Sequence, residues 1–348
     1  MRPPSGRDSL SFEIYFSTSE LPRTVNPMMT QGYFNYVEAS TPSSLYTTGK
    51  HRTRRNEETG ETSLEGIVLG ERAMEVHDAR LLEGTERPNV ARNGFELLHR
   101  PLVRGDLDFL DHREVCQEYY PQCTDAIRSA TGAAHVIPFD HNVRSATGYK
   151  SKEQSKGGQR VGRPEHITHG DYTLLSAPQR LRMLAEPPSM TDTLREFVEP
   201  GQGLVDPTLV DRGLASDGRF ALINVWRNIA HEPIAIHPLA LCDAQTVRPE
   251  DLVVFELHYP DRVGENYFSK HASRHRWYYY PEMTRDEALL IKQWDSAGTL
   301  ARSDGEHADA DNQEAPCTFN FHSAFRDPST PKDAPDRWSI EVRCLIVY

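Results

Sequence analysis

The feature that most constrains the fold is a succession of short β-type runs, which become dense in the second half of the chain. The runs are rich in β-branched and aromatic residues, and polar segments bearing Gly or Pro separate them. Helical patterning is confined to residues 111–131, expected as two short helices broken near Pro121, and to residues 177–185 and 190–198. This mixture indicates a β-sandwich or barrel with helical insertions. The runs expected to form strands are residues 12–17, 66–69, 94–99, 135–139, 220–226, 252–259, 277–280, 289–294, 318–322 and 339–347.

Length and composition favour one core domain with long decorations. A chain of 348 residues could hold one large domain or two ordinary ones. Hydrophobic residues make up 37% and charged residues 26%, which is polar for a globular protein, but 13 Phe, 14 Tyr and 4 Trp can build a sizeable core. The polarity is therefore expected in long loops, and composition places these at residues 47–63, 145–163 and 302–314.

Charge and cysteine content exclude several classes of partner. The formal net charge of −12 argues against nucleic acid and anionic membranes. The five cysteines include no Cys-x-x-Cys pair, so we expect reduced thiols in the cytoplasm rather than a disulfide framework or a zinc knuckle. The N-terminal residues carry no apolar signal segment, and no stretch approaches the about 18 apolar residues of a membrane span.

The sharpest local motif is His169-Gly170-Asp171. Residues two apart on a strand share a face, so His169 and Asp171 can offer an imidazole nitrogen and a carboxylate oxygen to one ion. A histidine from a distant strand would complete a two-His-one-carboxylate triad, which leaves adjacent positions open and suits iron(II) oxygenases. His-x-Asp alone also occurs by chance, and a histidine hydrogen-bonded within a strand is the alternative reading.

The C-terminal quarter offers the missing ligand and a carboxylate-binding pair. His322 ends an alternating run and is expected as the third ligand; His258 is its main rival. Arg337 and Ser339 share a face at the start of the last run, and a guanidinium beside a hydroxyl suits the tail of a dicarboxylate. Arg343 lies on the same face, yet only one arginine can reach a co-substrate that also binds the metal. We favour Arg337, although an arginine paired with a neighbouring carboxylate remains the alternative.

The order His-x-Asp, long gap, strand histidine and Arg-x-Ser matches the layout of 2-oxoglutarate-dependent oxygenases. It predicts Fe(II), 2-oxoglutarate as co-substrate and O2 at one centre. Four further residues are candidates to contact the substrate, although core packing or pairing with an acidic neighbour would also explain them. For His141, a structural role is preferred. The substrate candidates are Asn224, Arg227, Tyr278 and Tyr280.

Further stretches carry a family resemblance over most of the chain after about residue 65. They are residues 78–80, 93–97, 119–121, 131–133, 139–144, 169–172, 224–227, 239–243, 277–281, 295–296, 322–328 and 339–343. In these stretches the chain resembles the hydroxylase/desaturase family of CmcJ-like, AsaB-type and gibberellin-desaturase-like enzymes. The resemblance implies a mainly β (α+β) fold with helical decorations around a double-stranded β-helix (jelly-roll or cupin-like) core, and an iron(II) centre for secondary metabolism. Residues 1–65 are then an N-terminal extension packed on or lining the core, and residues 66–348 form the single oxygenase domain.

We therefore expect a cytoplasmic iron(II)- and 2-oxoglutarate-dependent oxygenase. Its reaction would be C–H hydroxylation, desaturation or oxidative ring closure on a small molecule, such as an amino acid or another carboxylate. The alternatives are a non-catalytic partner of a methyltransferase/oxygenase pair, a metal-binding barrel without this activity, and an iron oxidase that does not use 2-oxoglutarate. The substrate, the bond oxidised and the oligomeric state stay open.

Overall fold

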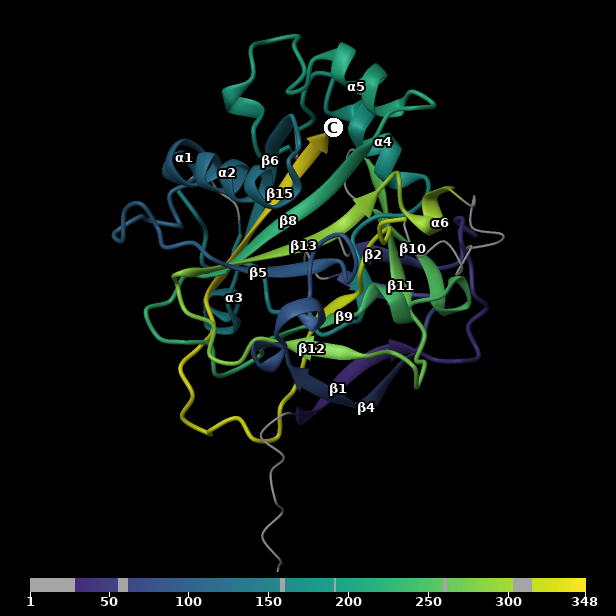
Figure 1. Cartoon of the computed structure of the whole chain (residues 1–348), viewed down its shortest axis with the longest axis vertical. Coiled ribbons are helices and arrows are strands. Elements are labelled where there is room, and N and C mark those ends of the chain that lie inside the picture. Colours follow the sequence, from purple (N-terminus) through teal and green to yellow (C-terminus); the bar gives the residue numbers. More distant parts are fainter. Residues whose placement is uncertain (1–28, 56–61, 157–159, 191, 259–261, 303–314) are drawn as a thin grey trace, which may run out of the picture.

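The computed structural model describes residues 29–55, 62–156, 160–190, 192–258, 262–302 and 315–348, which form two β-sheets with helices around them (Figure 1). The larger sheet has the strand order β1-β4-β12-β9-β14-β7-β11-β10-β2-β3, and the smaller has the order β5-β13-β8-β15-β6. The strands are β1 Met29–Val37, β2 Arg52–Arg55, β3 Thr62–Glu65, β4 Leu69–Asp78, β5 Phe95–His99, β6 His135–Arg144, β7 His169–Gly170, β8 Phe220–Asn228, β9 Leu239–Cys242, β10 Leu252–His258, β11 Val263–Ser269, β12 Trp277–Tyr279, β13 Glu287–Asp295, β14 His322–Ala324 and β15 Ser339–Val347. The α-helices are α1 His112–Glu114, α2 Tyr120–Thr131, α3 Ala146–Lys150, α4 Ser176–Met183, α5 Pro207–Leu214 and α6 Thr299–Arg302. The shorter turns are η1 Ala79–Leu81, η2 Gly84–Glu86, η3 Val115–Tyr119, η4 Arg195–Phe197, η5 Ala244–Thr246 and η6 Pro249–Asp251, of which η3 is π-helical.

The main core lies between the two sheets. Phe34 of β1 stacks on Trp277 of β12 and on Phe325, with ring centroids 4.5 and 5.5 Å apart. Leu222 of β8 and Leu345 of β15 belong to the same apolar cluster from the smaller sheet. Burying each such side chain contributes about 1.5–3 kcal/mol, so this contact dominates the packing of one sheet on the other.

At the start of β15, the two faces of the smaller sheet carry different side chains: apolar ones point outward and charged ones point toward the larger sheet. Along β15, Ile340 and Val342 point outward and join the apolar cluster beneath α2. Glu341 and Arg343 alternate with them and therefore point toward the larger sheet. A shift in the pairing of β15 with β6 between Arg343 and Cys344 marks a β-bulge at this point. The smaller sheet thus brings charged side chains into the space between the sheets.

A helical layer covers the outer face of β6 and β15 (Figure 1). The stretch starts at α1, passes through the π-helical turn η3 and continues into α2. Pro121 is the second residue of α2, beside the point where the stretch changes from π-helix to α-helix, and it has no N–H to donate to the preceding turn. The predicted break near Pro121 is therefore a change of helix type within one helical stretch, and Gly132 ends it in the left-handed conformation with φ 67°.

The strand predictions are confirmed where alternation and burial coincide, as in β8, β10, β12, β13 and β15. Residues 66–69 were wrongly predicted as a strand: they form the turn into β4, where Gly66 has φ 80°. Residues 318–322 are extended, but only His322 begins a strand, β14. The helix predicted over 190–198 is reduced to η4, and the strand predicted over 12–17 lies outside the described residues.

The first described residues belong to the larger sheet. β1 pairs with β4, and β2 pairs with β3 and β10. These strands join the same sheet as those that follow. The division of the chain at residue 65 stays a prediction. All five cysteines are free. No helix within the described ranges is long and apolar enough to cross a membrane.

Candidate metal centre and pocket

Strand pairing brings the two histidines of the predicted triad together. His169 of β7 is the direct antiparallel partner of His322 of β14, and their ring centroids are 4.4 Å apart. Asp171 follows β7 immediately, and one ligand atom from each of the three residues lies within 4.8 Å of the others. Residues separated by about half the chain are thus adjacent because the register of one strand pair places them so.

Both imidazoles are fixed in forms that suit a cation. Nδ1 of His169 donates to the Ile167 carbonyl over 2.7 Å, which leaves Nε2 facing Asp171 Oδ1 at 3.5 Å. Burial lowers the pKa of His322 to about 3, so this ring is neutral at physiological pH. Its Nδ1 is buried and has no hydrogen-bond partner within the described residues.

Asp171 is held from the opposite sheet. Asn224 of β8 donates to Asp171 Oδ2 over 3.0 Å, and the Asp171 backbone N–H donates to Gln293 of β13 over 3.2 Å. Burial alone would raise the pKa of this carboxyl, but Arg343 and the two nearby histidines hold it well below its usual range. The carboxylate is therefore ionised and aimed at the histidines, and the set of two nitrogens and one oxygen fits a metal such as iron(II).

Arg343 is occupied by carboxylates. Its guanidinium lies 2.7 Å from Asp140 Oδ2, 3.4 Å from Glu341 Oε1 and 3.6 Å from Asp171 Oδ2. These anions raise its pKa well above the usual value even though burial acts in the opposite direction. Arg343 thus positions Asp171 and balances the charge between the sheets.

Arg337 stands in a different environment. It is 3% exposed and lines the pocket that contains the two histidines and Asp171. One of its Nη atoms donates to the His237 carbonyl, whereas its Nε and the Ser339 hydroxyl have no hydrogen-bond partner among the described residues. Burial, together with the neighbouring Arg144, lowers the pKa of Arg337 to about 9. A buried cation in this state is suited to bind an incoming anion.

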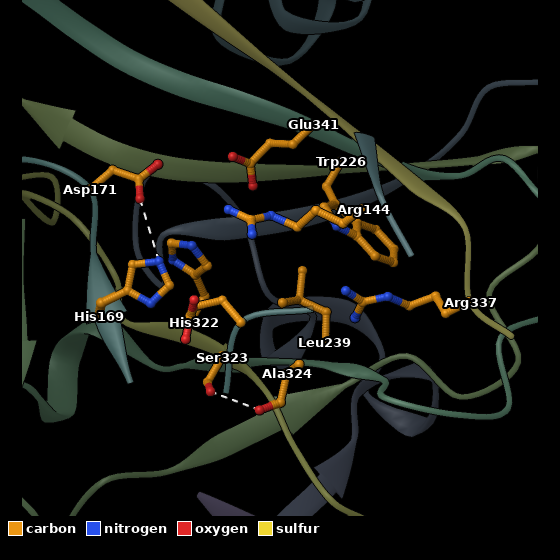
Figure 2. Close-up of a pocket in the computed structure, with 11 residues that line it drawn as sticks. Arg144, His169, Asp171, Trp226, Leu239, His322, Ser323, Ala324, Arg337 and Glu341 are labelled. Atoms are coloured by element: carbon orange, nitrogen blue, oxygen red, sulfur yellow. Dashed lines mark hydrogen bonds and ion pairs between the residues drawn. The ribbon is translucent and has the colours of Figure 1, made fainter. Parts of the chain in front are cut away.

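Figure 2 shows how the pocket is arranged. The histidines and Asp171 gather at one end, Arg337 reaches in from the other, and Trp226 and Leu239 lie between them. Bound metal and a carboxylate group would therefore be held at opposite ends of one pocket. The lining residues are Arg144, Glu165, His169, Asp171, Trp226, Leu239, His322, Ser323, Ala324, Arg337 and Glu341.

The predicted substrate contacts lie elsewhere. Arg227 points to the helix side of β8, where it donates to the Tyr119 hydroxyl and to the carbonyls of Arg100 and Arg285. Tyr278 and Tyr280 pack with Phe95 rather than lining the pocket. Their roles as substrate contacts stay predictions.

The remaining substrate candidate, Asn224, and the rival ligand, His258, have partners of their own. Asn224, predicted to contact substrate, faces the pocket side of β8 but holds Asp171. His258, the rival ligand, lies at the surface beside Glu256 at 2.9 Å.

Sequence reasoning missed several lining residues. Glu341 could have been found by parity, since it alternates with the outward-facing Ile340 and Val342. Arg144 ends β6 directly opposite Ser339, a pairing that no local pattern reveals. Trp226 lies on the inner face of β8, but burial of the whole strand hides any alternation in its sequence.

Fold and site together fit one class: a mainly β oxygenase whose candidate metal ligands lie between two sheets of a jelly-roll core. A structure titled iron and alpha-ketoglutarate-dependent endoperoxidase NvfI matches with a TM-score of 0.65 and 23% identity, covering 92% of this chain and 98% of that one. The jelly-roll fold that the family resemblance implied is thereby confirmed.

Sequence relatives identify the family. Alpha-ketoglutarate-dependent dioxygenase phiK from a fungal species is 30% identical over 261 residues, 74% of this chain and 79% of that protein. Hydroxylase/desaturase poxK from Penicillium oxalicum is 29% identical over 305 residues, 80% of each. A family model described as "Oxidoreductase/YMDC permease-like domain" matches residues 34–199 and 205–347. The chain belongs to this family, and its relatives include enzymes named as Fe(II)/2-oxoglutarate-dependent or alpha-ketoglutarate-dependent dioxygenases and others named as hydroxylase/desaturases.

Proposed function

We propose that His169, Asp171 and His322 bind iron(II), and that the chain uses this centre to oxidise a C–H bond of a small molecule in secondary metabolism. The observation that carries the proposal is the pairing of His169 with His322 beside an ionised Asp171. When bound at these residues, iron(II) would supply the oxidising chemistry with 2-oxoglutarate and O2, and the co-substrate would leave as succinate and carbon dioxide. Relatives such as poxK are named hydroxylase/desaturase, which supports the same kind of reaction here.

Arg337 and Ser339 bind the far carboxylate of 2-oxoglutarate in this proposal. The Arg337 Nε and the Ser339 hydroxyl are buried in the described structure without a hydrogen-bond partner; Ser339 begins the last strand and Arg337 lies two residues before it. Arg343 is not needed for this role, because three carboxylates already surround its guanidinium. The position of Arg337 opposite the histidines supports a co-substrate that spans the pocket (Figure 2).

The pocket also favours a substrate that carries a carboxylate. Arg144 lines it as a second cation and is not required by the 2-oxoglutarate site. Glu341 lies in the same pocket and burial raises its pKa, so its carboxyl can take up a proton near a bound anion. Leu239 and Trp226 supply apolar walls that exclude water from the reacting bond. A small, partly apolar acid satisfies these features, and an amino acid is one such molecule.

The cytoplasmic location stays a prediction. Five free cysteines support it, because reduced thiols are typical of that compartment.

The reaction is tested by supplying the full chain with iron(II), 2-oxoglutarate and air, together with a panel of small carboxylic acids, and measuring succinate. We expect succinate from the native chain and none above background from Asp171→Ala. Product formed at an unchanged rate after removal of 2-oxoglutarate would instead indicate an iron oxidase. If iron binds but neither succinate nor oxidised product forms, the non-catalytic alternatives gain support.

A further inference from the structure

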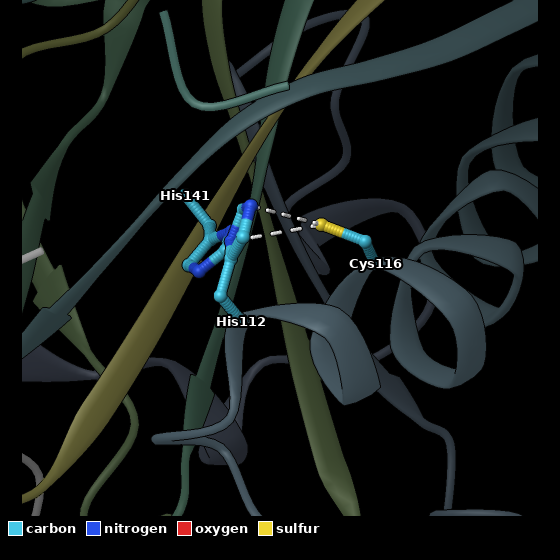
Figure 3. A group of neighbouring side chains, drawn as sticks. All are labelled: His112, Cys116 and His141. Atoms are coloured by element: carbon cyan, nitrogen blue, oxygen red, sulfur yellow. Dashed lines mark hydrogen bonds between the residues drawn. The ribbon is translucent and has the colours of Figure 1, made fainter. Parts of the chain in front are cut away.

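A second group of ligand-type side chains lies outside the pocket. His112, Cys116 and His141 each offer a nitrogen or sulfur atom, and these atoms lie within 4.8 Å of one another (Figure 3). They come from three separate elements: α1, the π-helical turn η3, and strand β6. None of them lines the pocket of the iron site. We refer to them as the His-Cys-His cluster.

The helical part of the cluster is arranged by local geometry. His112 and Cys116 are four residues apart, the spacing that places two side chains on one face of a helix. The Cys116 sulfur lies 3.8 Å from Nδ1 and 3.9 Å from Nε2 of His112. The Asp111 side chain accepts from the Glu114 backbone N–H and so fixes where the helix begins. The π-helical turn that contains Cys116 is a rare form, and such turns occur frequently at functional sites.

His141 completes the cluster from the sheet. Its strand partner is Val342, which packs beneath the helices, so the His141 ring also points to the helical side of β6. The ring stacks on that of His112, with centroids 5.2 Å apart and planes at 29°. The Tyr120 hydroxyl hydrogen-bonds to His141 Nδ1 over 2.9 Å. A partner of this kind orients a metal-binding imidazole and directs its other nitrogen, Nε2, to the ion.

The donor set points to a particular class of cation. Two imidazoles and one thiolate are the ligands of Zn²⁺ and similar thiophilic ions, whereas Mg²⁺ and Ca²⁺ prefer oxygen. Burial raises the pKa of the Cys116 thiol to about 12, so the thiol would give up its proton only as an ion binds the sulfur. His112 and Cys116 are only half-buried, so an ion can reach them from solvent.

We propose that the His-Cys-His cluster is a second metal site, which binds a thiophilic divalent cation such as Zn²⁺ and fastens the α1–η3 helical stretch to β6. An ion bound there would hold β6 in place close to the proposed iron ligands. The neighbour of His141 on β6 is Asp140, whose carboxylate lies 2.7 Å from Arg343, and Arg343 in turn contacts Asp171. The proposed role of this ion is structural, since the cluster is on the opposite face of the smaller sheet from the pocket.

Cobalt(II) is the probe that separates the two sites. The proposed iron ligands contain no sulfur, so an absorption band from thiolate to cobalt reports the second site alone. Anaerobic titration of the full chain should give two cobalt ions per chain and this band. Cys116→Ser should remove the band and one ion, whereas Asp171→Ala should remove one ion and keep the band. Cys317→Ser is the matched control, because Cys317 is also free and half-buried, and it should change neither.

A wild-type chain that binds one cobalt ion without the band overturns the second site and leaves the iron proposal standing. A band that survives Cys116→Ser, or disappears in Cys317→Ser, overturns the assignment to this cluster. Circular dichroism checks the fold of each variant. If Cys116→Ser does not fold, His112→Gln replaces it. This change at a half-buried side chain should weaken cobalt binding at the banded site at least about tenfold, and unchanged affinity would contradict the proposal.

Discussion

The Nδ1 hydrogen of His169 is donated to the Ile167 carbonyl, and this single bond decides which nitrogen faces Asp171. His322 is kept neutral by burial, and Asp171 is kept ionised by Arg343 and the histidines. His322 and Asp171 are therefore already in the protonation states that a cation binds. At this scale the sequence predicted the residue types, but the hydrogen bonds that select the tautomer and the charge come from the backbone and from distant strands.

Replacement of one histidine tests the ligand assignment. His322→Ala should reduce iron(II) binding from about one ion per chain to none that survives dialysis, since two ligands hold the ion poorly. His258→Ala is the matched control, because His258 is a surface histidine that pairs with Glu256. Iron content by elemental analysis distinguishes the variants. If both variants bind the same amount of iron, His322 is not the third ligand and another residue must supply it.

Arg337, which lies just before the last strand, and Arg343 within it should differ in their kinetic effect. Arg337→Gln removes a charge-assisted contact worth roughly 1.5–3 kcal/mol per bond, so the KM for 2-oxoglutarate should rise by about tenfold or more. Arg343→Gln leaves Asp140, Asp171 and Glu341 without their shared cation, and breaking a buried pair costs about 3–5 kcal/mol. It should therefore lower stability more than co-substrate affinity. Steady-state kinetics and chemical denaturation measure the two effects, and the reverse pattern would refute the Arg-x-Ser assignment.

At the scale of elements, the shortest strand carries the chemistry. β7 has two residues, yet it pairs with β11 on one side and β14 on the other, and this register sets His169 against His322. The sequence predicted the last strand with its full bounds because Ser339–Val347 is a long run rich in β-branched and other apolar residues. It could not predict β14, since residues 318–321 have the same alternation but do not pair as a strand. Pairing partners are long-range information that alternation does not contain.

The end of β13 offers a test of stability. Lys292 is buried and lies 3.0 Å from Asp295, which also pairs with Arg219 at 2.7 Å. Asp295→Asn would leave the Lys292 ammonium buried without its counter-ion and should cost about 3–5 kcal/mol in the free energy of unfolding. Chemical denaturation at neutral pH provides the measurement. A loss below about 1 kcal/mol would show that the ammonium finds another partner.

The same group predicts a pH dependence. Burial would raise the pKa of Asp295, but Arg219 and Lys292 lower it below its ordinary value. The stability that its charge provides is therefore present above the unfolded-state pKa of about 4 and is lost as the pH falls through the folded-state pKa. Between about pH 5 and pH 2 the native chain should lose more stability than Asp295→Asn. An equal loss in the free energy of unfolding for both proteins over this pH range would contradict this expectation.

At the scale of the whole molecule, the centre lies where the two sheets meet. The histidines belong to the larger sheet, while Asn224, Gln293 and Arg343 reach Asp171 from the smaller one. The fold class and the triad could be predicted, because they depend on short-range alternation and on a family pattern. The pocket walls and the His-Cys-His cluster could not, because both need the packing of helices and sheets that are distant in sequence.

Iron-dependent binding of 2-oxoglutarate is the most direct test of the central claim, since it needs no knowledge of the substrate. Under anaerobic conditions, with equilibrium dialysis of labelled 2-oxoglutarate, the full chain should bind about one molecule when iron(II) is present and much less without it. Asp171→Ala should lose the iron-dependent part, and Arg337→Gln should weaken it at least about tenfold. Binding that is equal with and without iron, or that is unchanged in Asp171→Ala, would contradict a centre in which His169, Asp171 and His322 hold iron for this co-substrate.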